Sequence, residues 1–438
     1  MDIRSIPACR ACGNPHLVQI LDLGIQALTG RFERPEAPPA PAGPLVLVRC
    51  DRTTAPGGDA AACGLVQLAH DYRGEDMYGP GYGYRSSVTR TMVRHLEQKA
   101  AALEKLAALK SGDAVLDIGC NDGTLLNAYR TPGLARFGID PSAGQFAAEF
   151  PQGAKLIVDF FSAARVRREA GEARFKVISS IAMFYDIAAP LDFMREIAAL
   201  LAPDGVWETE QAYLPATLGR LCYDAVCHEH LTYYSLQQIA WLATRAGLKL
   251  LDAGVNDING GSFRVLLARA DSPRRPEQAR LDALLAEEAR GGFLERAPYE
   301  RFAREVSRHR DIVRAFFHEA RAAGKLVLGY GASTKGNVLL QYCALGRDDL
   351  PAILDRYPRK QGLVAPGTRI PIIGEEEGRA RRPAYLFVLP WHFRDEMIPR
   401  EQAFLEAGGR LVFPLPVFEI VGAGGKRVEL RPHELPAR

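Results

Sequence analysis

Val-Leu-Asp-Ile-Gly-Cys-Asn-Asp-Gly, residues 115–123, joins a short apolar strand to a glycine loop that opens a helix. Glycines let the backbone N–H groups of such a loop approach a ligand that a side chain would otherwise block. This loop also carries carboxylates, which disfavour a phosphate and favour a ligand with a sulfonium or ammonium group and free ribose hydroxyls. We therefore predict that S-adenosylmethionine binds here, through Asp117, Gly119, Asn121, Asp122 and Gly123.

A second apolar strand, Phe137-Gly138-Ile139, ends in Asp140. It lies about 20 residues further on, where dinucleotide-binding folds place the acid that holds a ribose diol. The alternative is a strand-to-turn connection whose carboxylates are incidental. Four later positions complete the predicted cofactor set: Asp159, Phe160, Ala182 and Met183.

Strands and helices alternate along the middle of the chain, which predicts an α/β fold with a parallel sheet covered on both faces. The predicted strands are 115–118, 137–139, 155–158, 177–181 and 205–210. Residues 272–325 are charged and predicted to be largely helical, as a connector beside this sheet. A second Rossmann-like unit is predicted from the apolar run and glycine loop at 325–337, with strands at 352–355, 384–389 and 409–413.

The second glycine loop differs from the first in its charge. Ser333, Thr334 and Lys335 stand where the first loop has acids, so backbone amides, hydroxyls and an ammonium are available to an anion. The basic stretch 356–362 adds positive charge downstream. We infer a transferase whose acceptor is a nucleotide-linked compound; the alternative is a tight turn with a solvated lysine.

Four of the eight cysteines cluster near the start of the chain: Cys9, Cys12, Cys50 and Cys63. Four thiolates satisfy tetrahedral Zn²⁺ and leave no open position for chemistry, so the predicted zinc is structural. A catalytic zinc is not expected, because no histidine lies at ligand spacing. The wide interval between the third and fourth cysteine leaves ordinary buried or redox-active thiols as the alternative.

His228-Glu229-His230 combines imidazole and carboxylate groups suited to proton transfer. If this segment were helical, its two histidines, which are two residues apart, would point to different faces of the helix. They could therefore not bind the same metal ion. We interpret the tripeptide as a general base with a carboxylate that orients it; the alternative is a satisfied pair of core histidines. The glycine-rich segment 259–262 is either a structural turn or a loop of the same site.

Composition limits the classes of protein. The 438 residues suffice for two or three domains, and a net charge of +3 does not favour a nucleic-acid partner. No signal peptide and no membrane span is visible, and the cysteine usage suits a reducing compartment. We expect a cytoplasmic protein, monomeric or a small homo-oligomer, without nucleic-acid or membrane partners.

Taken together, these motifs resemble the sugar C-methyltransferase family, which makes branched deoxysugars from nucleotide-linked 4-keto sugars. The resemblance rests on the cysteine module and on segments 82–86, 117–123, 228–230, 260–262 and 329–337. It implies a zinc-binding domain at 1–75, a class I methyltransferase domain with a Rossmann-like fold at 76–272, and a second Rossmann-like domain at 273–438 that contributes to the sugar-nucleotide site. The activity it implies is methyl transfer to the carbon beside the ketone, C-3.

The resemblance also implies roles for individual residues. His230 matches the family's base and Glu229 the acid beside it, with His228 in the same set. The family's sugar enzymes have a tyrosine just before this tripeptide and a histidine after the fourth strand, where this chain has Cys227 and Tyr185. A thiol cannot donate a phenolic hydrogen bond to a developing enolate, so Tyr185 is our candidate donor.

The remaining predicted site residues belong to the substrate: Tyr82, Tyr84, Arg85, Asn259, Lys335, Asn337, Lys360 and Trp391. Three other functions compete. The first is O- or N-methylation of a sugar or small metabolite. The second is an NAD-dependent sugar-nucleotide oxidoreductase, which the missing third glycine of the second loop disfavours. The third is a non-enzymatic zinc-dependent binding module, which would not need the acidic loop.

Overall fold

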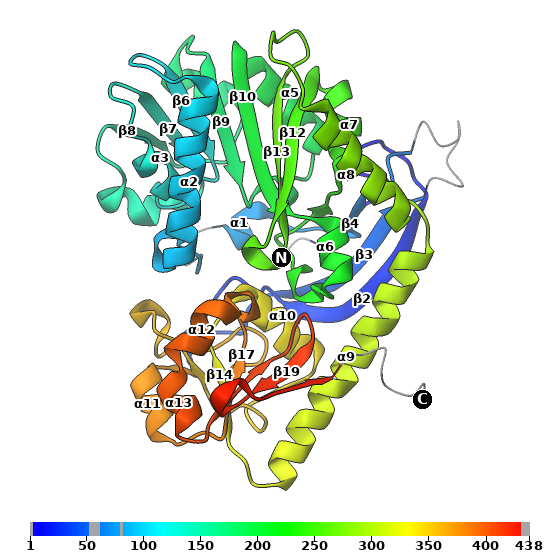
Figure 1. Cartoon of the computed structure of the whole chain (residues 1–438), viewed down its shortest axis with the longest axis vertical. Helices are drawn as coiled ribbons and strands as arrows, with labels where there is room; N and C mark the ends of the chain where they lie inside the picture. The colour runs from blue at the N-terminus through cyan, green and yellow to red at the C-terminus, as the bar shows by residue number, and fades with distance from the viewer. Residues whose placement is uncertain (1–2, 52–61, 79–81, 431–438) are drawn as a thin grey trace.

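Two seven-stranded sheets form most of the protein (Figure 1). The computed structural model describes residues 3–51, 62–78 and 82–430. The sheet built from residues 114–269 lies above the sheet built from residues 327–430 in the view of Figure 1. No helix in the described ranges combines the length and apolar character needed to cross a bilayer.

The first sheet has the strand order β8-β7-β6-β9-β10-β13-β12. Its strands are β6 (Ala114–Ile118), β7 (Ala135–Ile139), β8 (Ala154–Ile157), β9 (Phe175–Ile181), β10 (Leu201–Ala212), β12 (Leu248–Asn256) and β13 (Ser262–Arg269). The five predicted strands are parallel, as expected. The sequence did not predict β13, which runs antiparallel to both of its neighbours. The short turn between β12 and β13 leaves no room for the crossover helix that a parallel pair needs.

Helices cover both faces of this sheet because successive side chains of a strand point to opposite sides. On β6, Val115 packs into the core beneath α2 (Arg90–Ala107) and α3 (Thr124–Ala128). Its neighbour Leu116 packs into the core on the other side. The helices of that second face are α4 (Ala163–Ala170), α5 (Pro190–Leu200) and α7 (Leu236–Arg245).

The second sheet has the order β16-β15-β14-β17-β18-β19-β20, with the first five strands parallel and the last two antiparallel. Its strands are β14 (Val327–Tyr330), β15 (Ile353–Leu354), β16 (Ile372–Ile373), β17 (Tyr385–Val388), β18 (Arg410–Phe413), β19 (Phe418–Val421) and β20 (Arg427–Leu430). Its helices are α10 (Thr334–Tyr342), α11 (Glu375–Ala380), α12 (Arg394–Arg400) and α13 (Gln402–Glu406). The predicted second Rossmann-like unit is therefore present. Because the strand order reverses at β14, the loop after β14 lies where ligands bind in open α/β sheets.

The predicted connector is two helices, α8 (Gln278–Gly291) and α9 (Ala297–Ala322). Helix α8 packs on β12 of the first sheet, whereas α9 contacts β19 of the second sheet and β2 of the N-terminal region. In Figure 1, α9 runs along one side of the molecule from the first sheet to the second.

The N-terminal region forms a four-stranded antiparallel sheet of order β11-β4-β3-β2. Its strands are β2 (Leu17–Ala27), β3 (Ala42–Cys50), β4 (Val66–Leu68) and β11 (Thr232–Tyr233). The short pair of β1 (Arg4–Ser5) and β5 (His70–Asp71) lies beside it. Strand β11 comes from the middle of the chain and begins two residues after His230, so the N-terminal sheet helps to position the His-Glu-His segment. The region beyond β5 contains a short helix, α1 (Gly74–Met77).

Candidate active site

A cavity opens at the carboxyl ends of β6, β7 and β9, and we call it the β6 cavity. Seven of the predicted cofactor residues line it: Asp117, Gly119, Asn121, Asp140, Phe160, Ala182 and Met183. Asp140 is buried and already well bonded, because its Oδ2 accepts from the backbone N–H of Asn121 at 2.9 Å and its Oδ1 from that of Ser142 at 2.6 Å. The acid is thus held rigidly against the glycine loop.

Three predicted cofactor residues do not line the β6 cavity. Asp122 turns back to cap the next helix, where its Oδ1 accepts from Thr124 Oγ1 at 2.5 Å. Gly123 supplies the positive φ of 77° that starts this helix, and a Cβ there would lie 2.5 Å from Pro151. Asp159 is exposed and pairs with Arg165 at 3.0 Å. All three contact other protein groups and none is among the residues that line the cavity, so their part in binding the cofactor stays a prediction.

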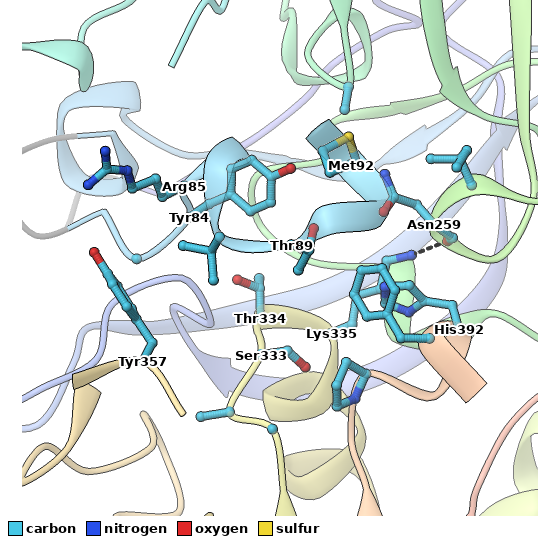
Figure 2. Close-up of a pocket in the computed structure, with 18 of the residues that line it drawn as sticks. Tyr84, Arg85, Thr89, Met92, Asn259, Ser333, Thr334, Lys335, Tyr357 and His392 are labelled. Atoms are coloured by element: carbon cyan, nitrogen blue, oxygen red, sulfur yellow. Dashed lines mark hydrogen bonds between the residues drawn. The ribbon is translucent and has the colours of Figure 1, made fainter. Parts of the chain in front are cut away.

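A second and larger cavity lies between the two seven-stranded sheets, and we call it the interdomain cavity (Figure 2). Nine predicted catalytic or substrate residues line it: Tyr82, Tyr84, Arg85, Tyr185, Glu229, His230, Asn259, Lys335 and Lys360. The two cavities share five lining residues: Tyr82, Tyr84, Met92, Ile181 and Ala182. A group bound in one cavity can therefore meet a group bound in the other.

His230 is oriented as a base. Its Nδ1 lies 2.8 Å from the carbonyl oxygen of Ala225, so this nitrogen carries the proton and donates it. Its Nε2 forms no hydrogen bond within the described part of the chain. The ring lies 4.0 Å from the ring of Tyr185, centroid to centroid. Burial lowers the pKa of His230 to about 3, so the imidazole is neutral at ordinary pH.

Glu229 is buried at the interface with the N-terminal region. Its Oε2 accepts from Thr29 Oγ1 at 3.4 Å, and burial raises the pKa of its carboxyl group. Gly30 packs directly against it, since a Cβ on Gly30 would lie 2.5 Å from Glu229 Oε1. The position of this carboxyl group therefore depends on a residue about 200 positions away, which sequence reasoning missed.

Three predicted catalytic or substrate residues face away from the interdomain cavity. His228 is fully buried, with Nε2 3.3 Å from the Gly43 carbonyl and its ring edge-on to Tyr72. Asn337 is also fully buried and donates from Nδ2 to the carbonyl of Thr29 at 2.8 Å. Trp391 donates from Nε1 to Asp224 Oδ2 at 2.7 Å. All three side chains contact partners within the protein, and their parts in catalysis or substrate binding stay predictions.

Burial of neutral histidines predicts an acid-sensitive fold. Burial lowers the pKa of His228 and of His309 to about 4, against roughly 6.5 in an unfolded chain. Between these values the unfolded state binds protons that the folded state does not, so stability falls as pH falls from about 7 to 4, by at most ~1.4 kcal/mol per pH unit for each group. We expect the melting temperature to drop across this range, and to drop less steeply in His228→Gln than in a variant of the exposed His318, His318→Gln. Equal slopes for the two variants would contradict this account.

The glycine loop after β14 repeats the geometry of the first loop. Asp355 follows β15 as Asp140 follows β7, and its Oδ2 accepts from the backbone N–H of Ala332 at 2.8 Å. Lys335 and Lys360 donate to carbonyl oxygens, of Asn259 at 2.6 Å and of Ala332 at 2.8 Å. Neither ammonium forms an ion pair within the described part of the chain, but the charge of Asp355 acts on Lys360 and that of Asp224 on Lys335, so the positive charge of this wall of the interdomain cavity is partly offset.

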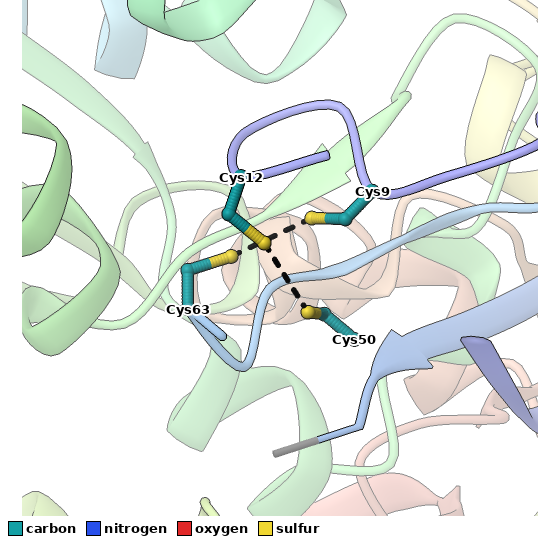
Figure 3. A group of neighbouring side chains, drawn as sticks. All are labelled: Cys9, Cys12, Cys50 and Cys63. Atoms are coloured by element: carbon teal, nitrogen blue, oxygen red, sulfur yellow. Dashed lines mark hydrogen bonds between the residues drawn. The ribbon is translucent and has the colours of Figure 1, made fainter. Parts of the chain in front are cut away.

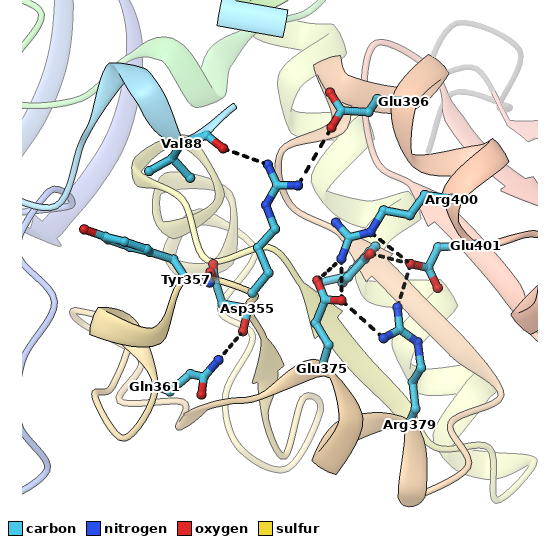
Figure 4. A network of polar contacts seen from close by, with 11 residues as sticks. Val88, Asp355, Tyr357, Gln361, Glu375, Arg379, Glu396, Arg400 and Glu401 are labelled. Atoms are coloured by element: carbon cyan, nitrogen blue, oxygen red, sulfur yellow. Dashed lines mark hydrogen bonds and ion pairs between the residues drawn. The ribbon is translucent and has the colours of Figure 1, made fainter. Parts of the chain in front are cut away.

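The arginines deeper in the same wall are paired (Figure 4). Arg379 binds Glu401 at 2.6 Å, and Arg400 binds Glu375. Arg356 donates to the carbonyl of Val88 at 3.1 Å and so ties the second sheet to the segment before α2. These paired charges rigidify the wall, and they leave the two lysines as its available cations.

The four predicted zinc ligands come together (Figure 3). All four sulfur atoms lie within 4.8 Å of one another, with 3.5 Å between Cys9 and Cys63 and between Cys12 and Cys50. Tetrahedral zinc with bonds of about 2.3 Å would separate them by roughly 3.8 Å, so the cluster fits the ion. No other group of this kind occurs in residues 3–51, 62–78 and 82–430.

Sequence reasoning missed two groups at the β6 cavity, Tyr78 and Asp186. Asp186 follows β9 by five residues, and a rule that examines every acid after a predicted strand would have found it. Tyr78 directly follows the short helix α1, where no local sequence pattern indicated a cofactor contact.

This strand order, with the cavity at the carboxyl ends of β6, β7 and β9, defines a class I methyltransferase that uses S-adenosylmethionine. A methyltransferase-domain model matches residues 92–253, a C-methyltransferase C-terminal domain model matches residues 257–416, and a model described as "Putative zinc binding domain" matches residues 9–78. The C-methyltransferase NovU of Streptomyces niveus is 31% identical over 428 residues, which cover 96% of this chain and 98% of NovU. The chain therefore belongs to this C-methyltransferase family.

Two more distant similarities cover parts of the chain. The ubiquinone biosynthesis O-methyltransferase of Azorhizobium caulinodans is 30% identical over 122 residues, 27% of this chain and 46% of that protein. Among solved structures, the mitomycin 7-O-methyltransferase MmcR is 16% identical with a TM-score of 0.33, and the match covers 41% of this chain and 54% of MmcR.

Proposed function

We propose that this C-methyltransferase methylates the carbon beside the ketone, C-3, of a nucleotide-linked 4-keto deoxysugar, with His230 as general base, in the biosynthesis of a branched sugar. The observation that carries the proposal is the imidazole of His230: Nδ1 is tied to a backbone carbonyl, Nε2 is free, and the ring lines the cavity adjoining the β6 cavity. A carbon beside a ketone is acidic only when its charge spreads onto oxygen, so a base and an oxygen-directed donor are both required.

The side chains divide this work. His230 Nε2 takes the proton from carbon, and its neutral state at ordinary pH makes it available to do so. The hydroxyl of Tyr185, or of Tyr82 or Tyr84, donates to the enolate oxygen; all three phenols line the interdomain cavity. S-adenosylmethionine, held in the β6 cavity, supplies an electrophilic methyl group, and the bound pair reacts as one unit.

The second sheet suits the nucleotide end of such an acceptor. Lys335 and Lys360 supply two ammonium groups that form no ion pair with a described carboxylate, and Ser333 and Thr334 line the same wall. The ammonium groups and the hydroxyl groups would both stabilise a bound diphosphate. The proposal keeps the division into 1–75, 76–272 and 273–438, with a cytoplasmic monomer or small homo-oligomer.

The decisive experiment screens nucleotide-linked 4-keto sugars with a labelled methyl donor and locates the methyl group by NMR. We expect a new carbon–carbon bond at C-3. Without methyl donor, we expect the C-3 proton to exchange with deuterated solvent in the wild type and not in His230→Ala. Methyl transfer to oxygen or nitrogen, with no exchange at carbon, would overturn the proposal.

Gly30 offers a test of Glu229 that leaves every polar group in place. An alanine at position 30 would displace the Glu229 carboxyl group, because the alanine Cβ would lie 2.5 Å from Glu229 Oε1. Misplacement on that scale costs about 10- to 100-fold in rate, so we expect Gly30→Ala to lower kcat by that factor in the methyl-transfer assay. Gly219→Ala is the matched control, because a Cβ at that exposed position meets nothing within 4 Å. A Gly30→Ala enzyme as active as the control would remove the positioning role of Glu229.

A further inference from the structure

Consecutive residues of one turn enter different cavities just after β9. The 3-10 turn Phe184–Asp186 is closed by a hydrogen bond from the Asp186 N–H to the Met183 carbonyl at 3.0 Å. Tyr185 lines the interdomain cavity beside His230, whereas Asp186 lines the β6 cavity. Asp186 thus lines the cofactor cavity and directly follows the residue that lies beside His230.

Asp186 has no compensating charge. Its Oδ1 is buried without a hydrogen-bond partner, and no described Arg, Lys or His forms an ion pair with it. The groups that act on it are the hydroxyl of Tyr78 and the buried carboxyl group of Glu229. Burial, with the like charge of Glu229 added, raises the pKa of Asp186 well above its usual range.

The other acids of the β6 cavity differ in this respect. Asp140 accepts backbone N–H groups, and Asp117 accepts from Ser179 Oγ at 2.6 Å. A buried carboxylate without such partners is costly, and a cation bound beside it offsets the cost. S-adenosylmethionine carries a positive sulfonium, and S-adenosylhomocysteine, the product left after transfer, has an uncharged sulfur.

We propose that Asp186 is the electrostatic partner of the donor's sulfonium group and makes the enzyme bind the charged methyl donor in preference to its neutral product. Once the methyl group leaves, the attraction at sulfur is gone and the product is released more easily. The proposal rests on the cofactor and not on the identity of the acceptor.

The test measures the dissociation constants of S-adenosylmethionine and S-adenosylhomocysteine by calorimetry for wild type and Asp186→Asn. An opposite charge at close range is worth about 10- to 100-fold here, so we expect that loss for S-adenosylmethionine and less than about threefold change for S-adenosylhomocysteine. Asp192→Asn is the matched control: it removes the same charge from an exposed position on α5 and should change neither constant. Equal losses for both ligands, or no loss for either, would overturn the proposal.

A measurement on the wild type keeps the proposal testable if Asp186→Asn does not fold. Burial raises the pKa of Asp186 in the free enzyme, and pairing with a cation should lower it, so binding of the cation should be accompanied by proton release. Calorimetry in buffers of different ionisation heat should show more proton release with S-adenosylmethionine than with S-adenosylhomocysteine. The other titratable groups facing Asp186 are Tyr78 and Tyr82 before α2, Tyr185 in its own turn, Cys227 and Glu229 before β11, and Tyr233 in β11. Equal release for both ligands would contradict the assignment.

Discussion

His230→Ala lowers kcat for methyl transfer by about 10²- to 10⁴-fold, the usual contribution of a positioned general base. His230→Asn is the sharper variant, because its amide can still donate to the Ala225 carbonyl while it has no basic nitrogen at the position of Nε2. Both variants should bind S-adenosylhomocysteine as tightly as the wild type, since His230 does not line the β6 cavity. Near-native turnover in both would remove the base assignment.

The pH dependence adds a second check on the same residue. With its pKa lowered to about 3 by burial, His230 stays unprotonated throughout the range in which an ordinary histidine titrates. The wild-type value of kcat/KM should therefore show no fall near pH 6.5 from this group. A decline centred there, absent from His230→Asn, would show that the imidazole is more exposed to solvent than the structure indicates.

Removal of one zinc ligand is expected to lower both the zinc content and the stability of the protein. Cys50 ends β3 and is completely buried, so Cys50→Ser should abolish stoichiometric zinc and leave three thiols without their ion. Structural zinc supplies about 10 kcal/mol or more in small zinc domains, although here the sheet also packs on its neighbours. We expect the melting temperature to fall by more than about 5 °C, which for a chain of this size corresponds to more than about 1–2 kcal/mol.

Zinc content by mass spectrometry and thermal scanning measure these effects. Cys343→Ser is the matched control, since Cys343 is equally buried but belongs to the core of the second sheet. It should retain one zinc per chain. Full zinc content in Cys50→Ser, or equal loss in both variants, would contradict the four-cysteine site.

The sequence predicted those features that depend on short, local patterns. The glycine loop that follows β6 lines a cavity, as expected. The four cysteines converge although Cys9 and Cys63 are 54 positions apart in the chain. The predicted strands of both sheets exist within a few residues of their expected ends. Each of these follows from apolar periodicity or from side-chain chemistry at a fixed spacing.

What the sequence could not predict depends on the direction of side chains. His228 is fully buried, whereas His230, two residues later, lines the interdomain cavity; both lie just before β11, which pairs with β4 through residues 165 positions apart. Asn337 and Trp391 carry polar groups that fit a binding site, yet each satisfies a partner inside the core, Thr29 and Asp224. The antiparallel β13 was missed because a strand's direction depends on its connection and not on its composition.

The pairing of β11 with β4 limits how the enzyme can be engineered. In a chimaera that takes only its first 75 residues from a relative, β4 would come from one protein and its partner β11, next to the His-Glu-His segment, from the other. Residue 30 would likewise no longer come from the same protein as Glu229, against which it packs. Recombination should therefore transfer the amino-terminal module together with residues 225–235 as one cassette. Crossovers placed in α9, which bridges the two halves, would keep that cassette intact while exchanging acceptor specificity.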